Sequence, residues 1–467
     1  MKKGRLYNRH EIEIISKSAI GKSIEDIMKE ELVTIGEKGI HKGSMGQLIE
    51  QFLFGIQTNN DSEPDFMPAG IELKVTPYKK LKDGSLSAKE RLVLNIINYM
   101  EEWKNDFRCS HFWFKNKTIQ LLWYLWEPNK DNKELKITHE KLLELAKNED
   151  LNQIEKDWSY IVNKIKEGKA HELSEADTMY LGACTKGANK DSLREQPNTN
   201  IKAMQRAFCF KTSYMTQLVR KYIGDYSDVE KILSSSSLFD DYINKVTRKY
   251  IGKTESELLE MFSISGKSKD RYSLIVNKMF NVKKGLKNTE EFLKANIVPK
   301  TIRVEKNGSI IQSISFPAFA FKEIINETWE DSGLKEELET TKYMFFVFKK
   351  EKEDYVFKGY KLWNMPQTII DNVVKSFWNK TINIIKNGVS FQIVNDTVYN
   401  DLPGMADNGI IHVRPHTSES AYKLNVGYEK GNIEKYADQL PNGEWMTKQC
   451  FWFNNTYIRD ILKEFND

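Results

Sequence analysis

Three charged residues near position 70 have the types and spacing of a metal-dependent hydrolytic centre. Asp65 is followed, after a six-residue spacer, by Glu72 and Lys74 in the run Gly-Ile-Glu-Leu-Lys-Val. Carboxylate oxygens are the ligands that Mg²⁺ prefers. An ammonium group beside them can steady an attacking hydroxide or the charge that develops on a phosphate. The three side chains therefore predict Mg²⁺-dependent hydrolysis of a phosphodiester.

The residues around Glu72 and Lys74 have the alternation of a β-strand. Ile71, Leu73 and Val75 alternate with Glu72 and Lys74, so a strand of period two would bury the aliphatic side chains and direct both charged groups to the other face. A carboxylate, a gap and Glu-x-Lys is a loose pattern, and the alternative is a solvated, charged face of an edge strand.

The flanking segments favour a site over a solvated face. The polar stretch 59–62 reads as a loop, and Pro64 keeps the residue before it extended, so that Asp65 is delivered to the strand. Residues 48–53 have helical apolar spacing, which would let Glu50 lean toward the same metal ion.

Length and composition limit the class of protein. The 467 residues exceed one ordinary core and predict two domains. Because 70 basic residues nearly cancel 66 acidic ones, any nucleic-acid surface must be a local patch. We find neither a secretory signal nor an apolar run of the roughly 18 residues that a membrane span needs. We expect a soluble cytoplasmic protein with no membrane partner.

Three further patterns are set aside. The four cysteines are scattered and form no Cys-x-x-Cys pair, so reduced thiols are expected. His412 and His416 are four apart, but Pro415 between them makes a helical zinc pair unfavourable. The segment Ile20-Gly21-Lys22-Ser23 ends like a phosphate-binding loop, yet Ser16 stands where the leading glycine is required. It predicts a capped helix start instead.

The same short signatures occur twice in the same order, which indicates an internal duplication. The two members of each pair share most of their residue types. The signatures that begin at Trp158 and Trp378 also have identical internal spacing. The pairs are Ile20-Gly21-Lys22-Ser23 with Ile251-Gly252-Lys253-Thr254, Trp158 and Ile165 to Gly168 with Trp378 and Ile385 to Gly388, and Phe208-x-Phe210 with Phe451-x-Phe453. We predict an N-terminal domain over 1–233 and a C-terminal domain over 234–467, joined at the serine run 234–237.

The second copy lacks the charged constellation. In the register of the repeat Val276 is opposite Glu50, and Lys300 is preceded two residues earlier by Val298 instead of a glutamate. One interpretation is drift in a purely structural domain. The other is a DNA-binding surface kept without catalysis.

Hydrophobic patterns predict α/β architecture, with two tandem copies of one fold, each a mixed sheet flanked by helices. In the first copy we expect helices at 11–36, 44–54, 138–168 and 213–223 and strands at 110–126 and 178–184. In the second we expect a helical start from 238 and strands at 309–316, 342–349, 354–362 and 410–414.

Several motifs together resemble the MutH/Sau-three-A group of GATC-specific endonucleases. They are Pro64-Asp65 through Glu72-Leu73-Lys74-Val75-Thr76-Pro77, the loop Lys186-Gly187-Ala188-Asn189, and the Phe-x-Phe-x-x-x-Tyr segment at 208–214. The similarity runs across nearly the whole chain. Two-copy length points to the restriction enzymes of that group, since the strand-nicking repair enzymes end after one copy.

The resemblance implies a restriction-endonuclease fold in each half and Mg²⁺-dependent cleavage of double-stranded DNA at GATC by the N-terminal copy. The C-terminal copy would be an effector that binds a second site. Asp65 and Glu72 resemble the metal ligands, Lys74 the catalytic lysine and Glu50 the auxiliary acid. Lys115 resembles a further active-site base or phosphate contact, and Lys117 fits nearly as well.

The resemblance also assigns DNA-reading residues and partners. Lys186 matches a lysine of the family's base-reading loop, and Arg414 and His416 occupy the corresponding loop of the repeat. Lysine and arginine donate to guanine O6 and N7 in the major groove. A monomer that dimerises on DNA and a cognate DNA methyltransferase in the same system are the partners implied. Cys209 replaces an aromatic hydroxyl of the repair relatives, so the resemblance does not predict sensitivity to adenine methylation.

The expected mechanism is in-line attack by a water molecule, activated at Asp65 and Glu72 and assisted by Lys74, leaving a 5′-phosphate. Two catalytic copies must meet on DNA to cut both strands, and binding to a second site would raise their local concentration. The alternatives are a GATC-specific strand-nicking repair endonuclease and a DNA-binding regulator without hydrolysis.

Overall fold

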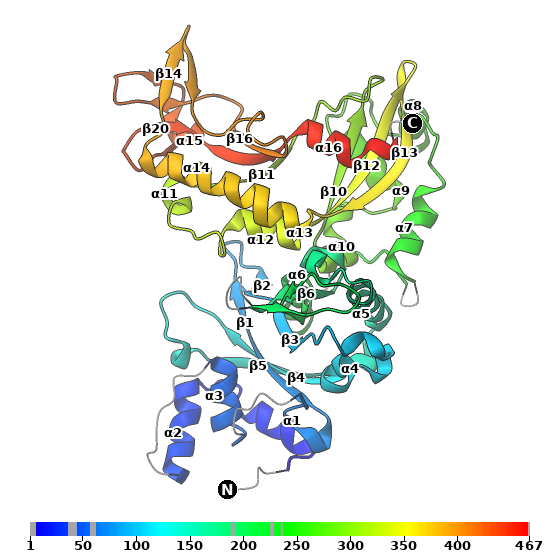
Figure 1. Cartoon of the computed structure of the whole chain (residues 1–467), viewed down its shortest axis with the longest axis vertical. Helices are drawn as coiled ribbons and strands as arrows, with labels where there is room; N and C mark the ends of the chain where they lie inside the picture. The colour runs from blue at the N-terminus through cyan, green and yellow to red at the C-terminus, as the bar shows by residue number, and fades with distance from the viewer. Residues whose placement is uncertain are drawn as a thin grey trace. The chain divides into compact units, whose positions relative to one another are not determined.

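The computed structural model divides the chain into two compact units (Figure 1). It describes residues 6–35, 44–56, 62–187, 192–224, 228–234 and 237–465, without the side chains of 31–35. The first unit comprises Met1–Tyr242 and Lys287–Ile297, and the second comprises Ile243–Leu286 and Val298–Asp467. Residues 59–61 of the predicted loop, 188–191 beside Lys186 and the central serines of the predicted hinge lie outside the described residues.

A four-stranded mixed sheet forms the centre of the first unit. Its order is β2-β1-β4-β5, with β1 parallel to β4 and antiparallel to β2, and β4 antiparallel to β5. The strands are β1 (Glu72–Lys80), β2 (Leu86–Ala88), β4 (Thr118–Leu125) and β5 (Ile137–Glu144). β4 is central and almost wholly buried, as its apolar run Ile119 to Tyr124 requires.

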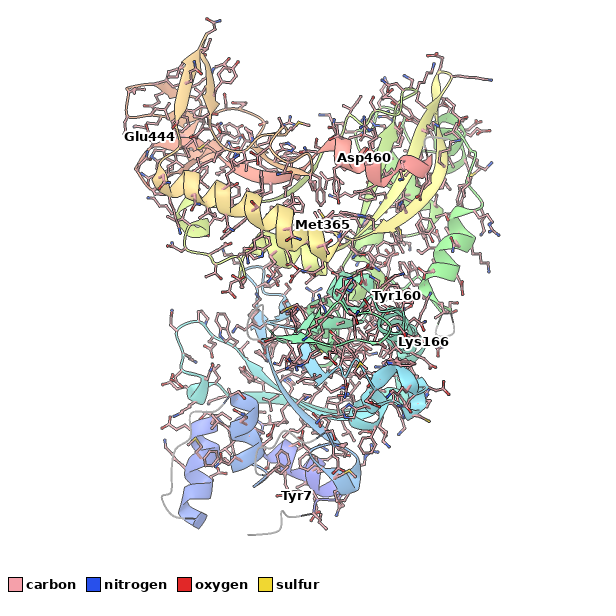
Figure 2. All side chains as sticks on the ribbon, viewed as in Figure 1. Tyr7, Tyr160, Lys166, Met365, Glu444 and Asp460 are labelled. Carbon is pink, nitrogen blue, oxygen red and sulfur yellow. The ribbon has the colours of Figure 1, made fainter. Side chains whose placement is uncertain are left out.

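Three amphipathic helices cover the start of this sheet (Figure 1). They are α1 (Arg9–Ser18), α2 (Ile24–Ile35) and α3 (Met45–Phe52). α3 packs on β1 and buries Leu48 and Ile49. Tyr7, labelled in Figure 2, donates its hydroxyl hydrogen to the carbonyl of Phe54 and packs edge-to-face on that ring. These contacts fix the helix that carries Glu50 against the strand that carries Glu72.

A second sheet and three more helices complete the first unit. The sheet has the order β3-β9-β6, all antiparallel. Its strands are β3 (Leu92–Ile96), β6 (Leu181–Thr185) and β9 (Arg206–Phe210), and the helices are α4 (His111–Asn116), α5 (Leu151–Lys166) and α6 (Thr212–Tyr222). On α5, the buried Asp157 accepts the backbone N–H groups of Met179, Tyr180 and Leu181 and so ties the helix to the entry of β6.

Two sequence predictions for this unit are wrong. Residues 110–117 were predicted as the start of a strand, but 111–116 form α4, which Ser110 caps by accepting the N–H of Trp113. Residues 138–144 were predicted as helix but form β5 on the edge of the sheet. Glutamate, lysine and leucine favour helix in isolation, and pairing with β4 overrides that preference.

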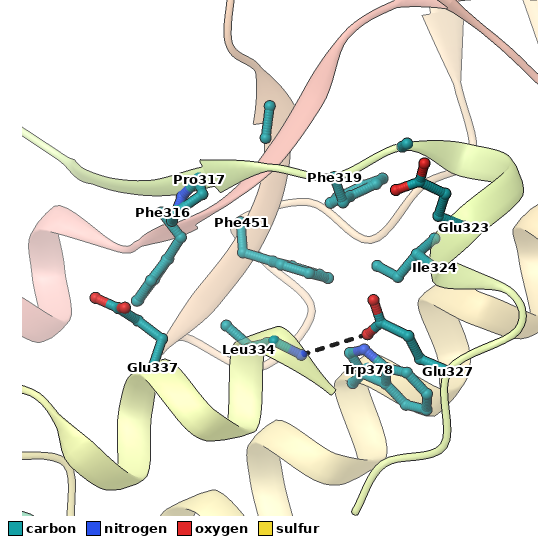
Figure 3. A pocket seen from close by; sticks show the side chains of 13 residues that line it. Phe316, Pro317, Phe319, Glu323, Ile324, Glu327, Leu334, Glu337, Trp378 and Phe451 are labelled. Atoms are coloured by element: carbon teal, nitrogen blue, oxygen red, sulfur yellow. Dashed lines mark hydrogen bonds between the residues drawn. The ribbon is translucent and has the colours of Figure 1, made fainter. Parts of the chain in front are cut away.

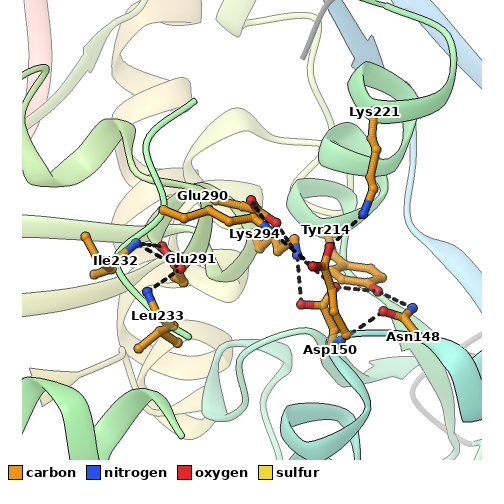
Figure 4. Close-up of polar contacts among 11 residues, drawn as sticks. Asn148, Asp150, Tyr214, Lys221, Ile232, Leu233, Glu290, Glu291 and Lys294 are labelled. Atoms are coloured by element: carbon orange, nitrogen blue, oxygen red, sulfur yellow. Dashed lines mark hydrogen bonds and ion pairs between the residues drawn. The ribbon is translucent and has the colours of Figure 1, made fainter. Parts of the chain in front are cut away.

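A segment from the C-terminal half belongs to the first unit (Figure 4). Helix α10 (Glu290–Ala295) packs on α6. The Lys294 ammonium group lies 2.8 Å from both carboxylate oxygens of Asp150 and 2.5 Å from Glu290 Oε1, although the side chain is 4% exposed. Glu291 accepts the backbone N–H groups of Ile232 and Leu233. Because of these bonds, the compact units differ from the predicted division at 233/234.

The second unit also contains two three-stranded sheets. Their orders are β10-β12-β13 and β11-β21-β16. The strands are β10 (Ile297–Val304), β11 (Ile314–Ala318), β12 (Lys342–Glu351), β13 (Asp354–Trp363), β16 (Ile411–Pro415) and β21 (Gln449–Phe453). The main helices are α7 (Phe239–Thr247), α8 (Glu255–Phe262), α9 (Arg271–Met279), α12 (Gly333–Thr340), α14 (Lys375–Asn387) and α16 (Asn455–Ile461). Smaller elements are the hairpin β14 (Phe391–Val394) and β15 (Thr397–Asn400) and the sheet β18-β17-β20-β19.

One turn has the same hydrogen bonds in both units. Gly21 has a φ of 88° and donates its N–H to Ile137 on β5, whereas Gly252 has a φ of 87° and donates to Phe357 on β13. The left-handed backbone favours glycine at both positions. Ser23 and Thr254 follow with side chains that accept the N–H three residues later, so the predicted capped helix start is confirmed at both places.

Candidate active site

Asp65, Glu72 and Lys74 converge at the start of β1. The Lys74 ammonium group lies 2.8 Å from Glu72 Oε1 and 3.4 Å from the carbonyl oxygen of Leu94 on β3. Asp65 accepts the backbone N–H of Leu73 at 2.9 Å, and its own N–H points to Glu72 Oε2 at 3.3 Å. The loop and the strand therefore hold both carboxylates side by side.

The alternation expected for this strand is present, but Glu72 is more buried than a surface carboxylate. Ile71 and Leu73 are 1% and 3% exposed in the core formed with α1 and α3. Glu72 is 2% exposed on the other face, where Lys74 and Lys115 compensate its charge. Burial raises the pKa of Glu72 because the charged form loses water.

Glu50 reaches the same site from α3. Its pKa is raised to about 7, first by burial and then by the negative charge of Asp65, while Lys74 opposes the shift. Three carboxyl groups, Glu50, Asp65 and Glu72, thus face two ammonium groups. The surplus negative charge in a partly dehydrated site is what a divalent cation would neutralise.

Lys115 lies on α4 and completes the cluster. Its ammonium group donates to the carbonyl oxygen of Glu63 at 3.0 Å and lies 3.6 Å from Glu72 Oε2. Lys117, the alternative in the sequence, ends α4 and is exposed. Of the two lysines, Lys115 therefore approaches the carboxylates.

His111 was missed by the sequence analysis. One turn before Lys115 on α4, its Nε2 lies 2.7 Å from the carbonyl oxygen of Ser62, and its Nδ1 is 3.3 Å from Asn95 Nδ2. Together His111 and Lys115 hold the loop that carries Asp65. The spacing i, i+4 was a usable signal, but the strand predicted for this segment separated the two side chains.

The donor set suits Mg²⁺ bound by few protein ligands. Within the described residues no group of three or more His, Cys, Asp and Glu side chains is arranged to hold a metal ion alone. Mg²⁺ commonly takes one or two carboxylates and completes its octahedron with water and phosphate oxygens. Asp65 and Glu72 meet that requirement.

The predicted base-reading lysine lies at the end of β6. Lys186 is exposed, and its backbone N–H donates to the carbonyl of Gln205. A Cβ atom on Gly187 would lie 2.5 Å from Ser192 Cβ, which is too close for a side chain. Position 187 therefore requires glycine. Lys186 does not take part in the carboxylate cluster.

Arg414 and His416 lie at the end of β16 in the second unit, both exposed. The Arg414 guanidinium is 5.3 Å from the centre of the Trp452 ring, and the His416 ring lies edge-on to the same indole. The backbone N–H of His416 donates to Lys448. His412 lies within β16 and His416 directly follows it, so the two histidines do not share a helix, in agreement with the sequence analysis.

A pocket of about 240 Å³ in the second unit has different chemistry (Figure 3). Phe316, Phe319, Phe451 and Trp378 form its walls, and the Glu327 carboxylate accepts the N–H of Gly333 inside it. No lysine or arginine is among its described lining residues. A phosphate would be repelled there, so this pocket is not a second hydrolytic site.

None of the helices in the described part of the chain is long and apolar enough to cross a membrane.

Comparisons with known proteins agree with this geometry. The family model of the DNA mismatch repair enzyme MutH matches residues 54–157, which include Asp65, Glu72, Lys74 and Lys115. The MutH proteins of Shewanella woodyi and Shewanella baltica are both 26% identical, over 40% and 39% of this chain and 79% and 81% of their own lengths. Fold, site and these matches define an endonuclease of the MutH class.

A further relative narrows the class. The type II restriction enzyme Sau3AI of Staphylococcus aureus is 38% identical over 96% of this chain and 97% of its own length. The chain therefore belongs to the Sau3AI family of type II restriction enzymes. It is a site-specific deoxyribonuclease that hydrolyses phosphodiester bonds.

Proposed function

We propose that the first unit cleaves double-stranded DNA at GATC in a Mg²⁺-dependent reaction, with Asp65 and Glu72 as metal ligands and Lys74 as the catalytic lysine. The observation that carries the proposal is the convergence of these three side chains at the start of β1. It supports hydrolysis because carboxylates and an ammonium group are placed within reach of one phosphate.

Each side chain has a defined task in this proposal. Lys74 is held by hydrogen bonds to Glu72 and to the Leu94 carbonyl. These bonds fix its positive charge where it can stabilise the attacking oxygen or the phosphate. Glu50, whose pKa is about 7, can accept a proton from the attacking water. When bound, Mg²⁺ supplies Lewis-acid polarisation of the phosphate and acidifies the attacking water.

Lys115 and His111 would keep the Asp65 loop in place. Lys115 also brings a second positive charge to the side of Glu72 that Lys74 does not cover. A phosphate contact by Lys115 would require its release from the Glu63 carbonyl.

We further infer that the second unit is a second copy of the same fold and acts as an effector that binds another GATC site. The sheet β11-β21-β16 of the second unit corresponds to β3-β9-β6 of the first, and β10-β12-β13 corresponds to β1-β4-β5. The glycine turn also occurs in both units with the same hydrogen bond. Arg414 and His416 stand at the end of β16, where Lys186 stands after β6. Val276 and Val298 replace the acids, so this unit would bind without cutting.

The proposed assembly follows from the chemistry. One active centre cuts one strand, so a chain that is monomeric in solution would pair with another on DNA, helped by effector sites that raise the local concentration. A cognate DNA methyltransferase would protect the host sites. A strand-nicking repair enzyme is less well supported, because the repair relatives match about 40% of this chain.

The test is cleavage of a random DNA library with sequencing of the ends. We expect linear products with GATC at every cut, no cleavage with EDTA and recovery with added Mg²⁺. Open circles without linear product from a supercoiled plasmid would support the nicking alternative. DNA that stays intact with Mg²⁺ present would contradict the proposed site.

A further inference from the structure

A small two-stranded ribbon borders a groove next to the predicted reading loop. β7 (Leu193–Arg194) and β8 (Ala203–Met204) pair antiparallel, with Leu193 opposite Met204 and Arg194 opposite Ala203. The groove, of about 530 Å³, lies between this ribbon with its flanks and residues 96–100. The major groove of B-DNA admits a two-stranded β-ribbon.

The ribbon presents an arginine and an amide as a joined pair. Arg194 is exposed, and its Nη2 donates to Gln205 Oε1 at 2.9 Å. This bond leaves one lone pair on Gln205 Oε1 and both hydrogens of Nε2, for which no partner is found among the described residues. Arg194 Nη1 also donates to the carbonyl of Leu193 at 3.1 Å, which leaves three of the five guanidinium N–H groups for a ligand. The pair therefore presents several donors and one acceptor to the groove.

The pair is also anchored to the predicted reading loop. Gln205 donates its backbone N–H to the carbonyl of Ser192 and accepts the N–H of Lys186. The backbone of Gln205 thus closes both ends of the loop that starts at Lys186. Any DNA contact made by Lys186 would bring the Arg194 and Gln205 side chains to neighbouring base pairs.

The groove and the active site are linked by strand β3. Leu94, whose carbonyl accepts from Lys74, is two residues before Ile96, and Ile96 lines the groove. Two residues of strand span about 7 Å, so DNA with its phosphate at Lys74 has base edges within reach of the ribbon. Arg194 and Lys202 among the lining residues outweigh Glu195, which gives the groove a positive balance.

We propose that the β7–β8 ribbon enters the major groove and that Arg194 and Gln205 read the G and the A of one GA half-site. Arginine pairs with guanine O6 and N7, and glutamine pairs with adenine N6 and N7. GATC consists of two such half-sites, so one ribbon reads one half. Lys202 contacts phosphate. The assignment of the bases rests on the proposed target sequence, whereas the reading role of the ribbon does not.

The experiment measures kcat/KM on duplexes that carry the cognate site or a single base-pair change, for the wild type and three variants. Arg194→Ala is expected to lower discrimination about 5- to 150-fold at the G position and not at the others. Gln205→Ala is expected to do the same at the A position. Lys202→Ala should weaken all duplexes alike and reduce the salt slope by about one.

Two further variants act as controls. Arg194→Lys keeps the charge and loses the planar two-donor contact, so it should relax the same position with an unchanged salt slope. Arg9→Ala removes an exposed arginine that pairs with Glu144, and neither residue lines the groove, so specificity and rate should be unchanged. Thermal unfolding of each variant shows whether the protein is folded.

The outcomes separate the two proposals. A wild-type site other than GATC would overturn the proposed target, and the ribbon would then be judged on whether Arg194→Ala relaxes one position of that site. Uniform loss on all duplexes, or unchanged discrimination, in folded Arg194 and Gln205 variants would overturn the reading role while leaving the proposed function intact.

Discussion

The two compact units, which we propose to be copies of one fold, differ where β1 and β10 begin. In the first unit Glu72 and Lys74 stand on β1, facing Asp65 and Glu50. In the second, Val298 and Pro299 precede Lys300 on β10, and Val276 is buried in α9. Valine can neither bind a cation nor compensate a charge. A repeated strand order would therefore not by itself preserve the hydrolytic site.

The acidic residues of the segment before β10 make structural contacts. In the register of the repeat the position of Asp65 corresponds to 289–291, which lies at the start of α10. Glu290 and Glu291 there bond Lys294, Lys231 and the backbone at 232–233 within the first unit. These carboxylates stabilise a packed helix, whereas Asp65 and Glu72 share a site with too few positive charges. The comparison teaches that the partners of a carboxylate decide between structural and chemical roles.

The largest contrast is expected for Lys74 and Lys300, which correspond in the proposed duplication. Lys74→Ala should lower cleavage about 10³-fold, since it removes a charge directed at the reacting phosphate. Lys300→Ala should change single-site cleavage less than about twofold. Single-turnover cleavage together with a gel-shift measurement of DNA binding tests both. Full activity of Lys74→Ala would remove the active-site assignment.

A large effect on stability is expected at α10. Lys294→Met leaves the largely buried Asp150 without its cation and leaves Glu290 with Lys231 alone, which should destabilise the first unit by about 3–5 kcal/mol. Its matched control is Lys306→Met in the second unit, where the exposed pair with Glu353 should contribute at most about 1 kcal/mol. Urea unfolding measures both. Equal midpoints would contradict the structural role given to Lys294.

A smaller effect is expected on the use of a second site. Arg414→Ala should reduce stimulation by a second GATC about 5- to 150-fold, the range expected for one lost guanine contact, and leave cleavage of a one-site duplex within about twofold. Comparison of one-site and two-site plasmids measures it. Stimulation that persists in a folded variant would argue for a purely structural second unit.

The smallest effect is an acid sensitivity confined to the second unit. His412 on β16 is 2% exposed, and burial lowers its pKa. The folded state therefore favours the neutral ring, and its stability contribution is present above the unfolded pKa of about 6.5 and is lost as pH falls toward the folded pKa.

In the register of the proposed duplication Gly182 of β6 corresponds to His412, and glycine cannot titrate. Unfolding monitored between pH 8 and 5 should therefore show a larger loss of stability in the wild type than in His412→Asn. The same slope in both proteins would exclude His412 as the source.

Much of the framework could be predicted from local sequence. The alternation around Glu72, the helical spacing of 48–53 and the repeated Gly-Lys-Ser/Thr turn are short-range patterns, and the structure has β1, α3 and two capped helices there. The failures at 111–116 and 138–144 are places where a serine cap and pairing with a buried neighbour outweighed composition.

The sequence by itself determined which residue types were available for chemistry: the acids and lysines of the first half and the valines that replace the acids in the second. Tertiary structure decided which of them meet. Only the packing of α4 and α3 around β1 brings Lys115, His111 and Glu50 to Asp65 and Glu72, and only the docking of α10 makes 287–297 part of the first unit. Contacts between distant segments depend on the summed burial of whole elements, which local patterns do not encode.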